Sequence, residues 1–237
     1  MLEDYVVIDL EMTGLNPKTD AILEVAAVRV RAGKPKETFG SLVKTERRLS
    51  DKITELTGIT EAMIKNAPDA NDVMAAYFAF VGEDVLVGHN VIFDYSFLKQ
   101  WAVNHKVSFE RTAVDTLKLA RKFLPPEQKK TLEDLCIYFG IPRENGHRAL
   151  DDAMETARLF DCLQQQFFET DRGQFAPKPL QYKVKKQSPA TEFQKKYLKL
   201  YASHFHLALP QPLEAMTKSE ASRLRDVWFA RYGRMPE

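Results

Sequence analysis

The feature that most constrains this chain is an apolar run near the N-terminus that leads directly into two acids. Residues Tyr5–Ile8 are all strand formers, and Asp9-Leu10-Glu11 follows them without a break. An uninterrupted apolar strand is typical of the centre of a sheet whose two faces are both covered. Side chains two residues apart in a strand point to the same face, so Asp9 and Glu11 should project together. Two adjacent carboxylates repel each other, which favours a raised pKa or a cation between them.

The pattern of the first 170 residues predicts an α/β domain. Two further strand patterns, at 21–30 and 38–43, follow the first with turn compositions between them, which indicates an antiparallel meander. Two more short strands are expected at 85–88 and 112–115. Helical patterns occupy most of the remainder, so the expected architecture is a mixed β-sheet flanked by helices. The expected helices cover residues 51–57, 61–65, 71–81, 93–104, 117–123, 131–139 and 149–168.

Further candidate residues stand at junctions between these elements. Asp94 lies where a strand hands over to a helix, Asp152 lies in the first turns of the last long helix of the domain, and His147 precedes that helix in a loop. Taken singly, each acid is explained by the attraction between a carboxylate and a helix N-terminus, and that explanation is kept for Asp151. Strand ends and helix starts are where folds concentrate functional side chains, so together these residues predict one pocket with Asp9 and Glu11.

Three motifs in this order carry a resemblance to a known family. They are Asp-x-Glu-x-Thr-Gly from Asp9, His-Asn-x-x-Phe-Asp ending at Asp94, and His-Arg-Ala-Leu-Asp-Asp-Ala from His147. Over residues 4–168 the chain resembles the DEDDh exonucleases, the superfamily of the proofreading epsilon subunit of bacterial DNA polymerase III. The resemblance implies a ribonuclease-H-like fold for these residues.

The resemblance also assigns roles to individual residues. Asp9, Glu11, Asp94 and Asp152 would hold two divalent cations, Mg²⁺ or Mn²⁺, and His147 would act as the general base. Asp152, rather than its neighbour, has the family spacing of five residues after the histidine. The expected contacts to the terminal nucleotide come from Thr13, Gly14, Leu15, Ile59, Asn90 and Phe93, although Thr57 stands where many relatives have a histidine.

The C-terminal part of the chain is basic, whereas the rest is acidic. Residues 1–170 carry 21 Lys/Arg and 27 Asp/Glu, a net charge of −6, whereas residues 171–237 carry 13 and 6, a net charge of +7. Proline and lysine between 171 and 190 predict a basic linker, and residues 191–237 predict a small helical module. A basic module suits contact with nucleic acid, and a solvated basic surface explains the charge equally well. The candidate phosphate contacts are Lys195, Lys196, Lys199, Arg223, Arg225 and Arg231.

These observations favour a metal-dependent 3′→5′ exonuclease that releases nucleoside 5′-monophosphates. The basic extension favours DNA over RNA as the nucleic acid with a free 3′ end, in proofreading or repair, with a DNA polymerase as the candidate partner. Three alternatives stay open: an RNA-trimming exoribonuclease of the ribonuclease T or oligoribonuclease type, a non-catalytic nucleic-acid-binding or polymerase-tethering module, and a ribonuclease-H-like endonuclease. The complete set of competent residue types argues against the non-catalytic module.

The cysteines and the apolar stretches of the sequence indicate the cellular compartment that we expect for the protein. The two cysteines, Cys136 and Cys162, lie in apolar helical patterns, which indicates free thiols rather than a disulfide or a metal site. The N-terminus lacks the features of a secretory signal, and no apolar stretch approaches the length that crosses a bilayer. We therefore expect a cytoplasmic protein that does not contact membranes.

Overall fold

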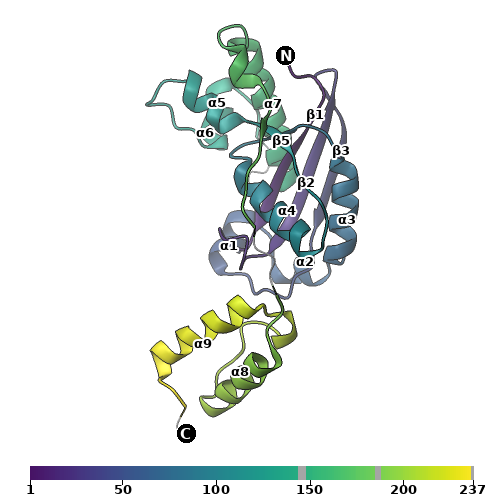
Figure 1. The fold of residues 1–237 in the computed structure, drawn as a ribbon. Helices are drawn as coiled ribbons and strands as arrows, with labels where there is room; N and C mark the ends of the chain where they lie inside the picture. Colours follow the sequence, from purple (N-terminus) through teal and green to yellow (C-terminus); the bar gives the residue numbers. More distant parts are fainter. Residues whose placement is uncertain (144–147, 185–187, 236–237) are drawn as a thin grey trace. The chain divides into compact units, whose positions relative to one another are not determined.

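The apolar run at the N-terminus becomes the centre of a mixed sheet. The computed structural model describes residues 1–143, 148–184 and 188–235, and the strands among them are β1 (Tyr5–Met12), β2 (Ile22–Arg31), β3 (Lys34–Leu42), β4 (Leu86–Gly88), β5 (Thr112–Asp115) and β6 (Lys178–Pro179). Their order is β3-β2-β1-β4-β5-β6 (Figure 1). Strand β1 pairs antiparallel with β2 and parallel with β4, so the buried apolar run has a hydrogen-bonded neighbour on each side.

The hairpin that joins β2 to β3 has a shorter turn than the sequence predicted. Ala32 and Gly33 both have positive φ, at 50° and 69°, which is the backbone of a two-residue hairpin turn. Strand β3 therefore begins at Lys34 instead of the expected Thr38. Pro35 lies within it, which an edge strand tolerates because the missing N–H removes no hydrogen bond from a second neighbour.

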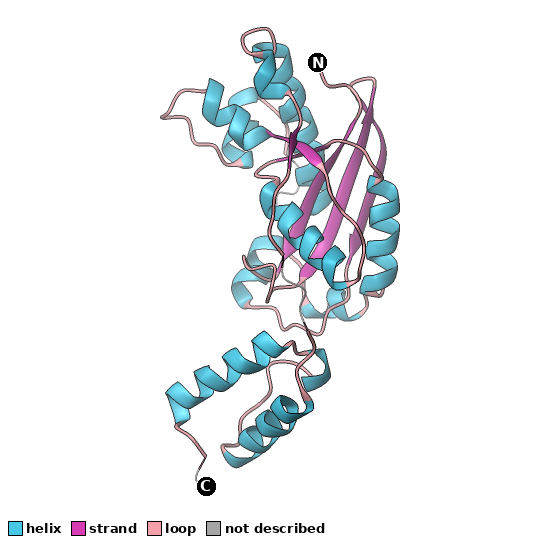
Figure 2. Cartoon of the chain, viewed as in Figure 1, coloured by secondary structure: helices cyan, strands magenta, loops and turns pink. Residues whose placement is uncertain are grey.

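Helices cover both faces of the sheet, as the α/β prediction required (Figure 2). One face packs against α5, α6 and α7, and the other packs against α3 and α4. The connection from β3 to α3 contains two short helices, α1 and α2. The bounds are α1 (Asp51–Thr57), α2 (Glu61–Lys65), α3 (Ala70–Val81), α4 (Ile92–Asn104), α5 (Thr116–Phe123), α6 (Leu132–Phe139) and α7 (Ala149–Phe167).

The segment from residue 171, expected to be a linker, is partly built into the sheet domain. Arg172–Phe175 forms a short 3₁₀ turn, and β6 adds an antiparallel edge strand next to β5. Phe175 is 2% exposed and packs against the rings of Phe123, Phe160 and Phe168. The segment is rich in proline and lysine, so its composition did not indicate that an aromatic side chain within it is buried. The packing of this side chain attaches the segment to the domain.

The chain divides into two compact units, one of residues 1–45 and 49–184 and the other of residues 46–48 and 185–237. The second unit contains helices α8 (Glu192–His204) and α9 (Lys218–Tyr232). Tyr201 and Trp228 stack in its core with ring centroids 5.4 Å apart. Both helices begin with a capping box, in which a threonine hydroxyl and a side chain three residues later satisfy backbone N–H groups reciprocally.

Both cysteines lie in the first unit. Cys136 is buried and Cys162 is half-buried, and both are free thiols. Among the helices in the described ranges, none has both the length and the apolar character needed to cross a membrane.

Replacing Phe175 with alanine tests how firmly residues 171–184 belong to the first unit. Phe175→Ala should lower the free energy of unfolding by about 3–5 kcal/mol, since removing a buried ring leaves a cavity. Urea denaturation measures the change. Ile137→Ala, at a side chain that is 72% exposed, is the matched control and should change stability by less than about 0.5 kcal/mol. Equal, small effects of the two substitutions would mean that the segment is the loose linker that its composition suggests.

Candidate active site

The four predicted acids come from three elements and meet at one end of β1. Asp9 and Glu11 project from the same face of the strand, because their positions differ by two. Asp152 enters from the first turn of α7, and its carboxylate oxygen lies within 4.8 Å of those of Asp9 and Glu11. Asp94, in the first turn of α4, accepts a hydrogen bond from the Leu10 amide at 3.2 Å. The backbone of β1 therefore ties Asp94 to the strand that carries Asp9 and Glu11.

Crowding and burial make this cluster unfavourable when all its acids are ionised. Burial raises the pKa of Asp9 well above its usual range, and the nearby Asp94 and Asp152 carboxylates add to the rise. Burial likewise raises the pKa of Glu11 to about 8, with the Asp152 and Glu24 carboxylates contributing. The pKa of Asp94 is also raised to about 8 by burial, although the Leu10 amide favours its charged form. A divalent cation among these oxygens would remove the repulsion, and an oxygen-only donor set suits hard ions such as Mg²⁺ and Mn²⁺.

The two adjacent aspartates at the start of α7 face different surroundings. Asp152 is buried among the acids and pairs with Arg143, whose guanidinium lies 3.1 Å from its carboxylate. Arg143 also lies 3.3 Å from Glu155, one turn further along the helix. Asp151 instead lines a neighbouring cleft. The choice of Asp152 as the metal-binding residue stays a prediction.

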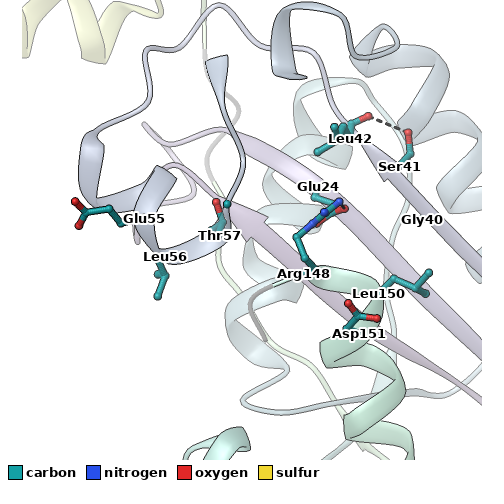
Figure 3. A pocket seen from close by; sticks show the side chains of 11 residues that line it. Glu24, Gly40, Ser41, Leu42, Glu55, Leu56, Thr57, Arg148, Leu150 and Asp151 are labelled. Atoms are coloured by element: carbon teal, nitrogen blue, oxygen red, sulfur yellow. Dashed lines mark hydrogen bonds and ion pairs between the residues drawn. The ribbon is translucent and has the colours of Figure 1, made fainter. Parts of the chain in front are cut away.

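A half-buried ion pair, which the sequence did not indicate, holds the start of α7. Glu24 on β2 is the register partner of Glu11, and its carboxylate accepts two hydrogen bonds from Arg148 at 3.1 and 2.7 Å. It also accepts a hydrogen bond from the Ala149 amide at 3.1 Å, so it caps the helix that carries Asp152. Figure 3 shows Arg148 reaching from α7 to Glu24. The available signal was a single carboxylate within the apolar strand Ile22–Arg31.

This ion pair lies in a cleft of about 800 Å³ beside the acid cluster. Strand β3, the end of α1 and the start of α7 form its walls (Figure 3). Among the described residues that line it, the acidic ones are Glu24, Glu55 and Asp151, and the basic one is Arg148. An excess of carboxylates repels phosphate groups. The cleft is therefore a poor channel for a nucleic-acid backbone in spite of its size.

The loop after β1 contains three of the predicted nucleotide contacts. The Thr13 hydroxyl accepts a hydrogen bond from the Ala21 amide at 2.9 Å, which closes the loop. A Cβ on Gly14 would lie 2.6 Å from the Asp20 carboxylate, so a larger residue here would require the Asp20 side chain to move. Leu15 is 81% exposed. A large apolar side chain held outward beside an acid cluster is suited to contact with a base.

The remaining predicted residues have different surroundings. Asn90 is exposed with a φ of 63°, and its amide donates to Asp115 at 3.0 Å. Phe93 is half-buried, and its ring contacts that of Phe97. Ile59 is a core residue with no exposed surface, so its predicted contact with a terminal base finds no accessible side chain here. His147 lies outside the described residues.

Comparison with known proteins identifies the family of this chain. A family model described as "Exonuclease" matches residues 6–160. The chain is 36% identical over 173 residues to the DNA polymerase III subunit epsilon of Aquifex aeolicus, covering 72% of this chain and 86% of that protein. It is 38% identical over 157 residues to the PolC-type DNA polymerase III of Clostridium perfringens, covering 66% of this chain but 11% of that much longer protein. The chain thus spans a small part of its PolC-type relatives.

Solved structures with similar folds agree with this assignment. Exonuclease X in complex with 5′ overhanging duplex DNA is 30% identical, with a TM-score of 0.56 over 68% of this chain and 90% of that chain. E. coli Exonuclease I in complex with a dT13 oligonucleotide is 19% identical and matches in fold, with a TM-score of 0.59 over 71% of this chain and 42% of that chain. The predicted ribonuclease-H-like fold is confirmed, and so is the resemblance read from the three motifs. The chain belongs to the exonuclease family.

Proposed function

We propose that this protein is a metal-dependent 3′→5′ exonuclease that releases nucleoside 5′-monophosphates from DNA ends, in proofreading or repair. The observation that carries the proposal is the meeting of Asp9, Glu11 and Asp152 within 4.8 Å, with Asp94 tied to the same strand. Membership of the exonuclease family supports the reaction class. The likeness to a DNA polymerase III epsilon subunit supports DNA as the substrate and a DNA polymerase as the partner.

The acids supply the sites for two cations. Asp9, Glu11 and Asp152 would hold one, and Asp9 would share the second with Asp94. Bound there, the cations would neutralise the phosphodiester and ease the loss of a proton from the attacking water. The raised pKa values of Asp9, Glu11 and Asp94 support this assignment, because acids that repel each other bind a cation in place of protons.

The other residues of the site would position the substrate and transfer a proton. His147 is the proposed base for the attacking water, since an imidazole with an ordinary pKa of about 6.5 accepts a proton near neutral pH. Leu15, exposed on the loop closed by Thr13, would pack against the terminal base. Attack of water on the last phosphodiester would break its bond to the 3′ oxygen of the preceding nucleotide and release a nucleoside 5′-monophosphate.

The organisation of the chain is part of the proposal. Residues 1–170 would form the exonuclease domain. Strand β6, which pairs with β5, would belong to the same domain. Residues 191–237 would form the helical module, which would contact nucleic acid. The cytoplasmic location expected from the sequence stays a prediction.

The two neighbouring aspartates of α7 provide the direct test. With a DNA oligonucleotide labelled at its 5′ end, Mn²⁺ and a mispaired 3′ terminus, the wild-type chain should produce a ladder that shortens from the 3′ end. Asp152→Asn should reduce the rate by more than about 100-fold, the upper end of losses seen when groups supporting a metal site are removed. Asp151→Asn should retain activity because Asp151 lines the neighbouring cleft.

Two results of that assay would contradict the proposal. Similar losses in both variants would show that Asp152 has no special role in the site. Cleavage of a closed circular DNA, or an unchanged rate in EDTA, would remove the end-dependent, metal-dependent reaction itself.

The pH dependence of metal stabilisation tests the acid cluster separately from catalysis. With folded pKa values of about 8 for Glu11 and Asp94, the folded chain binds protons that the unfolded chain releases above pH of about 4. In EDTA, the stability from these groups is therefore lost as the pH rises toward 8. Cations replace the protons, so Mn²⁺ should raise the Tm more at pH 8 than at pH 6.

Differential scanning fluorimetry in EDTA and in Mn²⁺ measures this difference. The Asp152→Asn variant, which lacks one of the carboxylates, serves as the comparison and should show a smaller shift at both pH values. An equal wild-type shift at pH 6 and pH 8 would mean that cations do not compete with protons for this cluster.

Glu24 is expected to act as a positioning residue. Glu24→Ala removes the cap of α7 and the partner of Arg148, so the rate should fall by about 10–100-fold, as for groups that support metal ligands. The loss should fall on kcat and on the Mn²⁺ midpoint, with a smaller change in KM for the oligonucleotide. Glu55→Ala removes an exposed carboxylate from the same cleft and should leave both values unchanged. A change confined to KM would mean that Glu24 contacts the substrate instead.

A further inference from the structure

The second unit has a groove of its own between its two helices. A hollow of about 290 Å³ is lined by residues of α8 and α9 together with Arg234, which follows α9. Phe193, Tyr197 and Phe229 supply aromatic surface, and Arg225 and Arg234 supply charge. Among the described residues that line it, none is acidic. The groove therefore combines ring faces with positive charge.

Phe193 is the unusual member of this groove. Its side chain is 77% exposed, although a phenylalanine in a small helical unit would ordinarily be covered. It lies one helical turn before Tyr197, and the two rings are nearly parallel with centroids 6.4 Å apart. Tyr197 in turn meets the edge of Phe229 at 6.0 Å. The exposed ring thus lies at the end of a row of three aromatic side chains and presents an open aromatic surface.

The charges beside these rings are arginines rather than the lysines of α8. The guanidinium groups of Arg225 and Arg234 lie 5.8 and 5.9 Å from the centroid of the Phe229 ring. Arg225 also pairs with Asp226, but surface pairs of this kind contribute little and exchange readily. Lys195 is instead paired with Glu192 and Glu214 at 2.9 and 3.2 Å. The arginines are therefore better placed than Lys195 to meet phosphate groups.

We propose that this groove is a second binding site for single-stranded nucleic acid, which holds one base against Phe193 and the adjoining phosphates on Arg225 and Arg234. An exposed aromatic platform flanked by arginine is the combination that binds single strands without sequence preference. The excess of eight Lys/Arg over five Asp/Glu in residues 191–237 complements an anionic backbone. The choice of occupant rests on the proposed function, in which the substrate is a nucleic acid.

Substitutions at Phe193 test the stacking contact in the full chain. With EDTA present to prevent cleavage, fluorescence anisotropy of a labelled dT12 oligonucleotide gives the Kd. Phe193→Ala should weaken binding about tenfold, within the range for loss of one stacked base. Phe193→Tyr should keep wild-type affinity because it retains the ring. Leu200→Ala is the matched control, since Leu200 is also exposed on α8 but does not line the groove.

A spectroscopic measurement and a salt titration separate the two kinds of contact. The fluorescence of a Phe193→Trp variant should be quenched by dT12, and an oligonucleotide with abasic sites should quench it less. Arg225→Gln and Arg234→Gln should each reduce the slope of log Kd against log salt by about 0.7, the value for one phosphate contact to a single strand. Unchanged dT12 affinity in Phe193→Ala, with no quenching of the tryptophan, would overturn the proposal.

The groove and the catalytic proposal can fail independently. If the wild-type chain cleaves no DNA in Mn²⁺ while Phe193→Ala still weakens dT12 binding, the exonuclease proposal fails and the groove stands. If cleavage is normal and the Phe193 variants bind dT12 as the wild type does, the groove proposal fails alone.

Discussion

The repulsion among carboxylates at the end of β1 is the constraint on which the rest of the site depends. Charged side chains brought this close would separate unless the backbone held them. Alternation along β1 fixes Asp9 and Glu11, and the Leu10 amide fixes Asp94. The Glu24 cap fixes the start of α7 and with it Asp152. Hydrogen bonds from the backbone and a half-buried ion pair thus maintain an arrangement that burial and repulsion between the carboxylates oppose.

The sequence predicted the parts of this arrangement that depend on local order. The strand ending in Asp9 and Glu11 and the helix starts near Asp94 and Asp152 follow from periodicity. The resemblance to the exonuclease family selects Asp152 instead of the neighbouring aspartate. Glu24 could not be assigned in the same way. Its role depends on Arg148, more than a hundred residues away, and on α7 crossing beside β2, which no local pattern contains.

Two other differences have related causes. Phe175 is one apolar residue in a segment rich in proline and lysine, so composition indicated a linker while a single buried ring determined the packing. Ile59 was expected to contact a nucleotide because of its place in a motif, but the structure places it in a small core with Leu23 and Ile64. A motif gives the neighbourhood of a residue in space, whereas the direction of its side chain depends on the cores around it.

The distribution of charge gives the two units complementary tasks. An acidic first unit repels a polyanion, so its affinity for substrate would depend on the cations that its carboxylates bind. A basic, aromatic groove in the second unit would hold a strand without any cation. Linking two such sites raises the effective concentration of the strand near the acids, provided that one molecule can reach both. The proposed groove would therefore supply the affinity that the catalytic cluster, by its own electrostatics, cannot supply before it binds metal.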